Sequence, residues 1–373
     1  MITGMPRLFS VAGAAWTLAA LAVLAGAVAP APVDRAAARI LMDDGNFKDA
    51  FEPLKALALA PGHDGETAAD FQRAVQCLQN LNRTTEVDAL REAVAAAHPQ
   101  DWIVLSEIAQ NFLDLDHQGV MIAGQFERGG HRGGGKAAHA LQRDRVRALQ
   151  LFRQALDVVE AKAGEPKRGE ELVMRDRFTA ALQSLGGNRQ AWRLQTLTDL
   201  TKLPDYEDGW WYGNGNVQGA PVNEQDNPIL YAEPASWRAA KNDGERWRWA
   251  LAAKSQRFPE HADRELLARA EFLNDQFGVQ TMAEYSWWFA RSADGDQGDS
   301  AKSQLQIESL GVDETIAKLA SGIKRFKLPD EQNPIRLYQR IVEHAPHDSD
   351  PYRSALVLLA QVFENRRQYP RAA

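Results

Sequence analysis

Residues 142–163, QRDRVRALQLFRQALDVVEAKA, are the stretch that decides the fold. Apolar side chains recur every three or four residues on one stripe: Val146, Leu149, Phe152, Leu156 and Val159. Charged side chains fall off that stripe: Asp144, Arg145, Arg153 and Asp157. A period near 3.6 residues predicts an amphipathic helix that buries the stripe and leaves its charged positions in solvent.

Small and large residues alternate within this helix in a way that favours stacked helix pairs. Ala148, Phe152 and Ala155 follow the Ala-x3-Phe-x2-Ala spacing of the second helix of a tetratricopeptide repeat. The small residues let a neighbouring helix approach, and the ring fills the space between pairs. The sequence therefore predicts an all-α fold of degenerate tetratricopeptide-like helical repeats, an α-solenoid.

The same periodicity predicts further helices on both sides of this stretch. Their bounds are residues 34–43, 66–81, 85–97, 169–185, 189–201, 237–258, 263–277 and 355–364. Asp101 and Asn333 are predicted N-caps, and Asp313 is predicted to cap a helix that carries Ile316, Leu319, Ile323 and Phe326. The predicted organisation is a signal at 1–27 (or an anchor to 33), helical repeats at 34–204 with a glycine-rich insertion at 117–141, an irregular loop at 205–235, and helical repeats at 236–373 with a truncated last repeat.

Composition excludes some classes of function. Of the 373 residues, 25% are charged, and the net charge of −7 argues against a nucleic-acid binder because no segment is dominated by basic residues. The single cysteine, Cys77, rules out an internal disulfide and lies on an apolar helical face, where a buried and inert thiol is expected.

The N-terminus carries a predicted export signal. Arg7 precedes an apolar stretch at 11–25, and Ala25-Gly26-Ala27 fits a cleavage site after Ala27. The apolar character continues almost to residue 31, so membrane attachment through residues 8–31 is the alternative. Either case places the body of the protein in an extracytoplasmic compartment, in the periplasm or cell envelope or secreted.

The glycine-rich insertion admits three interpretations. Gly130-x4-Gly135-Lys136 matches the start of a phosphate-binding loop, but Ala137 stands where the magnesium-binding hydroxyl is needed, which makes a P-loop-like NTPase the weakest alternative. A flexible glycine loop is the plainest interpretation. The third is a contact surface on which three cationic side chains meet an anionic group: Arg128, Arg132 and Lys136.

No residue set predicts catalysis, a metal or a cofactor. His131 and His139, and likewise His344 and His347, lack the spacing of a metal site, and no nucleophile motif is present. The protein is therefore predicted not to be an enzyme.

Aromatic residues in the 205–235 loop are the remaining binding candidates. Trp210, Trp211 and Tyr212 either stack on a sugar ring or a peptide, or fill the seam between two helical halves. Trp237, Trp247 and Trp249 occur in a helical pattern and are predicted to pack in or near the core.

Four stretches carry a resemblance to a known family: 129–135 (GGHRGGG), 143–151 (RDRVRALQL), 242–250 (NDGERWRWA) and 322–331 (GIKRFKLPDE). In these the chain resembles the N-terminal helical region of large bacterial alpha-2-macroglobulin-like envelope proteins. The resemblance implies a longer chain with macroglobulin domains downstream, in a family of endopeptidase inhibitors that trap proteases. Cys77 is followed by Leu-Gln-Asn, so the Cys-x-Glu-Gln thioester pattern is absent and trapping cannot be assigned to this segment.

Taken together, the sequence predicts an exported, non-enzymatic scaffold that binds protein partners on a concave surface of stacked helices. The alternative from another class is a carbohydrate- or peptide-binding accessory module that uses the 205–235 loop.

Overall fold

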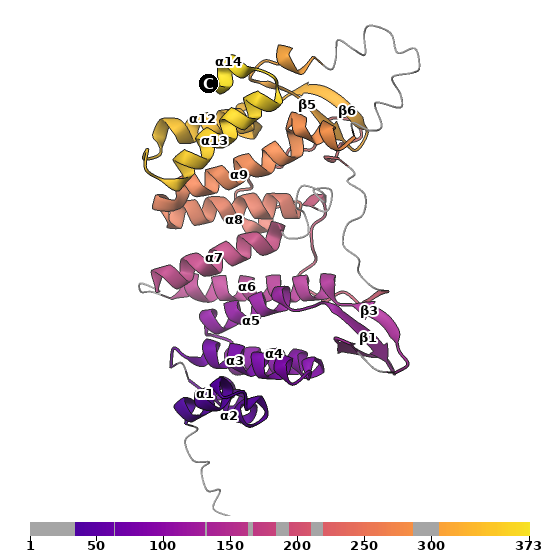
Figure 1. Cartoon of the computed structure of the whole chain (residues 1–373), viewed down its shortest axis with the longest axis vertical. Coiled ribbons are helices and arrows are strands. Elements are labelled where there is room, and N and C mark those ends of the chain that lie inside the picture. The colour runs from indigo at the N-terminus through magenta and orange to yellow at the C-terminus, as the bar shows by residue number, and fades with distance from the viewer. Residues whose placement is uncertain are drawn as a thin grey trace, which may run out of the picture.

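The computed structural model describes residues 34–62, 64–130, 133–162, 167–183, 194–209, 219–285 and 306–373. The chain is mostly helical with little sheet, as predicted (Figure 1). The α-helices are α1 (Arg35–Asp43), α2 (Phe47–Leu59), α3 (Thr67–Asn80), α4 (Val87–Ala97), α5 (Trp102–Asp114), α6 (Leu141–Ala161), α7 (Arg168–Gln183), α8 (Asp243–Arg257), α9 (Ala262–Phe277), α12 (Pro334–His344), α13 (Asp350–Asn365) and α14 (Tyr369–Ala372). The 3-10 helices are η1 (Thr84–Glu86), η3 (Trp237–Ala239), η4 (Pro259–His261), η5 (Val279–Tyr285), η6 (Ile307–Ser309) and η7 (Asp330–Gln332).

The helices are stacked largely in sequence order into an elongated body, with α1 and α2 at one end and α12 to α14 at the other (Figure 1). Helix α6 packs against α5 and α7, and α8 in turn packs against α7 and α9. One hydrophobic core cluster extends from α1 to Phe272 on α9, and a second joins other residues of α9 with α12, α13 and the strand β5 (Glu314–Leu319).

Helix α6 buries its apolar stripe as the periodicity predicts. Val146, Leu149, Phe152, Leu156 and Val159 are all buried. Ala148 and Ala155 are also fully buried, which agrees with small residues at close helix contacts.

The predicted helix caps at Asp101 and Asn333 are confirmed. The Asp101 carboxylate accepts hydrogen bonds from the backbone N–H groups of Ile103 and Val104. The Asn333 side chain does the same for α12, whose first residue is Pro334. Each cap satisfies N–H groups that have no partner inside the helix.

The insertion at 117–141 is not a loop throughout, as the interpretation of a flexible glycine loop implies, because strands form on both sides of its glycine run. Strands β1 (Gln118–Ile122), β2 (Gln125–Arg128) and β3 (Lys136–His139) join β4 (Glu207–Asp208) in an antiparallel sheet of order β2-β1-β3-β4. Ala123 and Gly124 connect β1 to β2 with positive φ at both residues (49° and 82°), the geometry of a type I′ hairpin turn. Alanine rarely adopts positive φ, so the turn carried no recognisable signal.

A second hairpin replaces the helix that was predicted after Asp313. Strands β5 and β6 (Gly322–Lys327) pair antiparallel, with Ile316 opposite Arg325 and Leu319 opposite Gly322. Ile316 and Leu319 are buried, but on a pleated strand and not on a helix face. Their spacing of three residues fitted the helical period by coincidence.

Gly219 belongs to the 205–235 segment and lies directly against β5. Its φ is +80°, and a Cβ there would meet the Leu319 backbone carbon at 2.7 Å. Ala220, the next residue, forms a parallel bridge with Leu319. This segment thus anchors the second hairpin through close backbone contact.

Gly219→Ala is expected to lower the free energy of unfolding by about 2–3 kcal/mol, because the methyl group meets backbone atoms that cannot rotate away and the positive φ adds strain. Urea denaturation of the full chain measures the change. Gly45→Ala is the matched control, since Gly45 has the same φ of +80° but no atom within 4 Å of a Cβ. Equal losses in the two variants would contradict the close approach.

Several predictions fall wholly or partly outside the described residues, including the export signal or anchor at 1–33 and most of the helix predicted at 189–201. Within the described part of that helix, residues 197–200 are not helical, so the prediction is wrong there. No helix among the described residues has the length and apolar character needed to cross a membrane.

Candidate functional site

Trp210, Trp211, Tyr212 and Arg132 lie outside the described residues, so their predicted roles stay predictions. The two other predicted contact residues, Arg128 and Lys136, are described and occupy different environments.

Lys136 is exposed at the start of β3 and forms an ion pair with Asp208 on β4. A phosphate-binding loop needs a helix N-terminus directly after its lysine, because the helix supplies the N–H groups that hold the phosphate. Here Lys136 begins a strand instead, and α6 starts only at Leu141. The NTPase alternative therefore has no structural support at this lysine.

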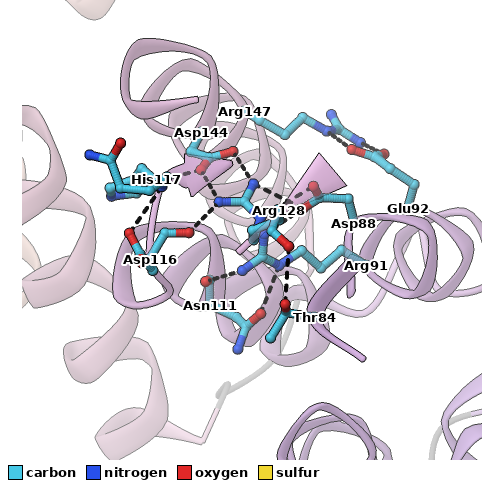
Figure 2. A network of polar contacts seen from close by, with 11 residues as sticks. Thr84, Asp88, Arg91, Glu92, Asn111, Asp116, His117, Arg128, Asp144 and Arg147 are labelled. Atoms are coloured by element: carbon cyan, nitrogen blue, oxygen red, sulfur yellow. Dashed lines mark hydrogen bonds and ion pairs between the residues drawn. The ribbon is translucent and has the colours of Figure 1, made fainter. Parts of the chain in front are cut away.

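Arg128 is buried at the end of β2, and its guanidinium donates to carboxylate and carbonyl oxygens of the chain (Figure 2). Its Nη1 and Nη2 donate to the two carboxylate oxygens of Asp144 on α6 at 2.8 and 2.9 Å. Its Nε and Nη2 reach Asp88 on α4 at 3.2 and 3.0 Å, and Nη1 also donates to the Asp116 carbonyl at 2.7 Å. Arg128 is thus unavailable at the surface for an external anion, and its guanidinium fastens the sheet to two helices.

Further hydrogen bonds extend this arrangement. We call it the Arg128 network, and its members are Arg128, Asp88, Asp144, His117, Arg91 and Asn111. His117 Nδ1 donates to Asp144 Oδ2 at 2.7 Å. Arg91, fully buried, donates to the Asn111 side-chain and backbone oxygens at 2.7 and 2.6 Å. Burial, together with the nearby Arg128 charge, lowers the pKa of Arg91 to about 10. Two arginines therefore share a buried site whose charge the carboxylates of α4 and α6 offset.

The pKa of Asp144 reflects the same arrangement. Burial alone would raise it, but the hydrogen bonds donated by His117 and Arg128 outweigh burial and hold the pKa of Asp144 below its ordinary value. A carboxyl with a depressed pKa stabilises the fold above the unfolded-state pKa of about 3.9, and this contribution is lost as the pH falls through the folded-state pKa.

Acid is therefore expected to destabilise the protein partly through Asp144. The urea midpoint of the wild type should fall as the pH drops below about 4, because protonation of Asp144 breaks its pairing with Arg128. The Asp144→Asn variant, which has no such proton to take up, should show a shallower fall over the same range. Identical pH profiles for the two proteins would contradict this assignment.

Arg145, the next residue on α6, is buried on another side of the helix. Its Nη2 donates to Asp243 Oδ2 at 3.1 Å, and its Nη1 to the Thr198 hydroxyl at 2.9 Å. Asp243 begins α8, so this pair connects α6 to the following half of the stack. The prediction that Asp144 and Arg145 face solvent is wrong, because Asp144 is buried against Arg128 of the sheet and Arg145 is buried against Asp243 of α8.

A groove of about 450 Å³ lies along the last three turns of α6. Its lining combines side-chain amides, one ion pair and apolar groups: Gln100, Gln150, Arg153, Gln154, Asp157, Val158, Ala161 and Leu200. We call it the amide groove. Arg153 pairs with Asp157 and lies over the rings of Trp237 and Trp249, with its guanidinium carbon 5.7 and 5.8 Å from their centres.

A second groove of about 530 Å³ lies between α6, α7 and α8, and we call it the charged groove. Its lining residues are Val159, Glu160, Lys162, Glu171, Arg175, Trp249, Ala253, Gln256 and Arg257. Glu171 is buried and accepts from Arg175 Nε at 2.9 Å and from Arg257 Nη2 at 3.0 Å. Burial would raise the pKa of Glu171, but the bonds from Arg257 and Arg175 hold it below its ordinary value.

Consecutive residues of α6 line the two grooves, Val158 the amide groove and Val159 the charged groove. Paired ions, amides and a half-buried tryptophan suit non-covalent recognition more than bond-breaking chemistry. The sequence pattern missed these positions because the polar side of an amphipathic helix looks the same whether it faces solvent or a groove. The amides at 150 and 154, four residues apart, were the available signal.

The described part of the chain gives no separate indication of a reactive centre. Cys77 is fully buried in the core, as predicted, and burial raises the pKa of its thiol. Trp247 is buried, and Trp237 and Trp249 are half-buried, which confirms their predicted packing role. Among the described residues there is no cluster of three or more His, Cys, Asp or Glu side chains able to hold a metal ion.

The two grooves on α6 are the candidate functional site of this chain. Comparisons of the chain with protein-family models, with curated proteins and with solved structures found no match.

Proposed function

We propose that this protein is a non-enzymatic scaffold that binds a partner protein along the last turns of α6. The observation that carries the proposal is that two open grooves are lined by the last turns of this one helix, together with residues of α7, α8 and the segments around Gln100 and Leu200. Trp249, Arg153 and Arg257 line or border them, and tryptophan and arginine are the residues most enriched where protein interfaces gain their affinity.

The buried ionisable groups support a role without catalysis. General acid–base chemistry works best with a pKa near the operating pH. Burial instead lowers the pKa of Arg91 and Arg366 only to about 10 and of Arg248 to about 9, and it raises the pKa of the Cys77 thiol. These groups are suited to packing and pairing between elements.

We further propose that the stack is a degenerate tetratricopeptide-like solenoid. The packing of each helix on its neighbours in sequence, and the burial of Ala148, Phe152 and Ala155 on α6, support this. An α-solenoid offers a continuous surface for an extended partner, in line with the position of the two grooves.

The predicted export and the resemblance to the N-terminal region of alpha-2-macroglobulin-like envelope proteins are carried forward as proposals. The mass of the native protein in envelope extracts, detected with an antibody against residues 34–373, tests both. A band several times heavier than 41.4 kDa supports a larger envelope protein. A band at or slightly below that mass counts against the larger envelope protein, and recovery from the cytoplasm counts against export.

The scaffold proposal is tested by co-purification. The tagged full chain should recover a discrete partner from cells of its source, and Ala161→Arg or Gln256→Arg should reduce that recovery because each adds bulk and charge to a groove. Both positions are exposed, so neither variant disturbs the core. Ala37→Arg, an exposed helical position on α1, is the control. Equal recovery by all variants would refute binding at α6.

A further inference from the structure

The amide groove carries three glutamines, and two of them are already held in place. Gln154 Nε2 donates to the Pro99 carbonyl at 2.8 Å, and Gln150 Nε2 donates to the Leu200 carbonyl at 3.0 Å. Since a carbonyl only accepts, these contacts fix which end of each amide is nitrogen. The oxygen of Gln154, part of the capacity of the Gln150 oxygen and the whole side-chain amide of Gln100 remain to meet a ligand.

The hydrogen-bonding capacity that is left suits a group that both donates and accepts. Each side-chain NH₂ keeps a second hydrogen, and each amide oxygen can accept two bonds, of which Gln150 Oε1 uses one for Arg147 at 3.2 Å. A peptide unit offers one N–H and one C=O, the complements of the C=O and NH₂ groups of these side-chain amides. The groove therefore matches a polypeptide backbone in chemistry.

The charge of the groove excludes strongly ionic ligands. Arg153 is neutralised by Asp157 and is held against Trp237 and Trp249. A phosphate or a polyanion would meet Asp157, and a polycation would meet Arg153. A ligand segment without net charge is repelled by neither Asp157 nor Arg153 and places no unpaired charge in the groove.

The shape of the groove fits an extended chain. Its lining on α6 extends from Gln150 to Ala161, a rise of about 16 Å that equals about five residues of extended polypeptide. Val158, Ala161 and Leu200 provide apolar contact along the same path. In an extended peptide alternate side chains point the same way, so one set can contact these groups while the backbone meets the amides.

We propose that the amide groove binds an extended, uncharged peptide segment of the partner through its backbone, with Gln100, Gln150 and Gln154 as the recognising groups. This inference rests on the proposed function, because it specifies how the partner is held at α6. It predicts that the bound segments lack charged side chains and that binding depends strongly on their backbone N–H groups.

The test selects short random peptides displayed on phage against the full chain and measures their binding by fluorescence anisotropy. Synthetic copies of a selected peptide then carry one methylated backbone nitrogen at a time. Methylation at alternate positions should weaken binding about fivefold to tenfold, the loss of one hydrogen bond. Gln100→Ala and Gln154→Ala should each weaken binding to a similar degree, whereas Gln110→Ala on α5, outside the groove, should leave it unchanged.

Three results would overturn the proposal. The first is that no peptide is enriched, and the second is that enriched peptides bind the glutamine variants as well as the wild type. The third is a glycan-array signal that Gln154→Ala abolishes, which would assign the groove to a sugar. If Ala161→Arg still loses the co-purified partner while no peptide binds, the scaffold function stands and only the backbone-binding inference fails.

Discussion

Replacing Asp144 with alanine is expected to lower the free energy of unfolding by about 3–5 kcal/mol, because it leaves the buried Arg128 guanidinium without its two-bond partner. Asp144 and Arg128 are each about 3% exposed at their side chains, so water cannot take over the lost bonds. His117 would lose its acceptor in the same step. Urea denaturation of the full chain, followed by circular dichroism, measures the effect.

Asp157→Ala is the matched control. Asp157 lies on α6 like Asp144 and pairs with an arginine, Arg153 of the same helix, but it is largely exposed. Its loss should cost no more than about 0.5 kcal/mol, the value of an exposed pair four residues apart on a helix. A loss at Asp144 as small as that at Asp157 would mean that the Arg128 network does not hold the sheet to the helices.

Replacing Phe152 with alanine is expected to cost about 3–5 kcal/mol, because it opens a cavity in a packed core. The Phe152 ring is fully buried, and its centre lies 6.1 Å from that of Phe178 on α7. The ring thus fills the space between consecutive helices of the stack. Its removal should lower the urea midpoint without changing the far-ultraviolet spectrum of the native state.

Val173→Ala on α7 serves as the reference for Phe152, since Val173 is 46% exposed. A surface truncation of this kind should change stability by less than about 0.5 kcal/mol. If Phe152→Ala cost no more than Val173→Ala, the stripe of α6 would not be the core of the stack.

Helix content was predictable from the sequence because helices are specified locally. The stripe from Val146 to Val159 and the caps at Asp101 and Asn333 each depend on residues within a few positions of one another. Hydrophobic periodicity and capping residues are local signals of this kind, and they can be recognised directly in the sequence.

The two hairpins escaped prediction because their signals were ambiguous or atypical. Ala123 occupies a turn position that normally carries asparagine, aspartate or glycine. Ile316 and Leu319 fit a helical spacing, although the β-branched residues Thr315, Ile316 and Ile323 favour a strand. The pairing of β3 with β4 joins residues about 70 positions apart, and no local pattern specifies such a contact.

The candidate site was predicted least well. Arg128 was predicted to meet an anionic group at a contact surface, but it is buried, and its partners Asp88 and Asp144 come from two helices that only the folded chain brings to β2. The grooves likewise combine Gln100, Gln154 and Leu200 from separate segments. Buried charge and surface charge have the same appearance in a helical pattern, so tertiary packing decides between them.

Site-specific photo-crosslinking in cells of the source tests most directly the claim that a partner protein binds at α6. A photoreactive residue is placed in turn at Ala161 in the amide groove, at Gln256 in the charged groove, at Asn223 in the 205–235 segment and at Ala37 on α1. We predict a crosslinked product with the same partner at Ala161 and Gln256 and none at Asn223 or Ala37. A product at Asn223 alone would indicate that the partner binds the 205–235 segment and not the grooves. The absence of any product at both groove positions would contradict the account.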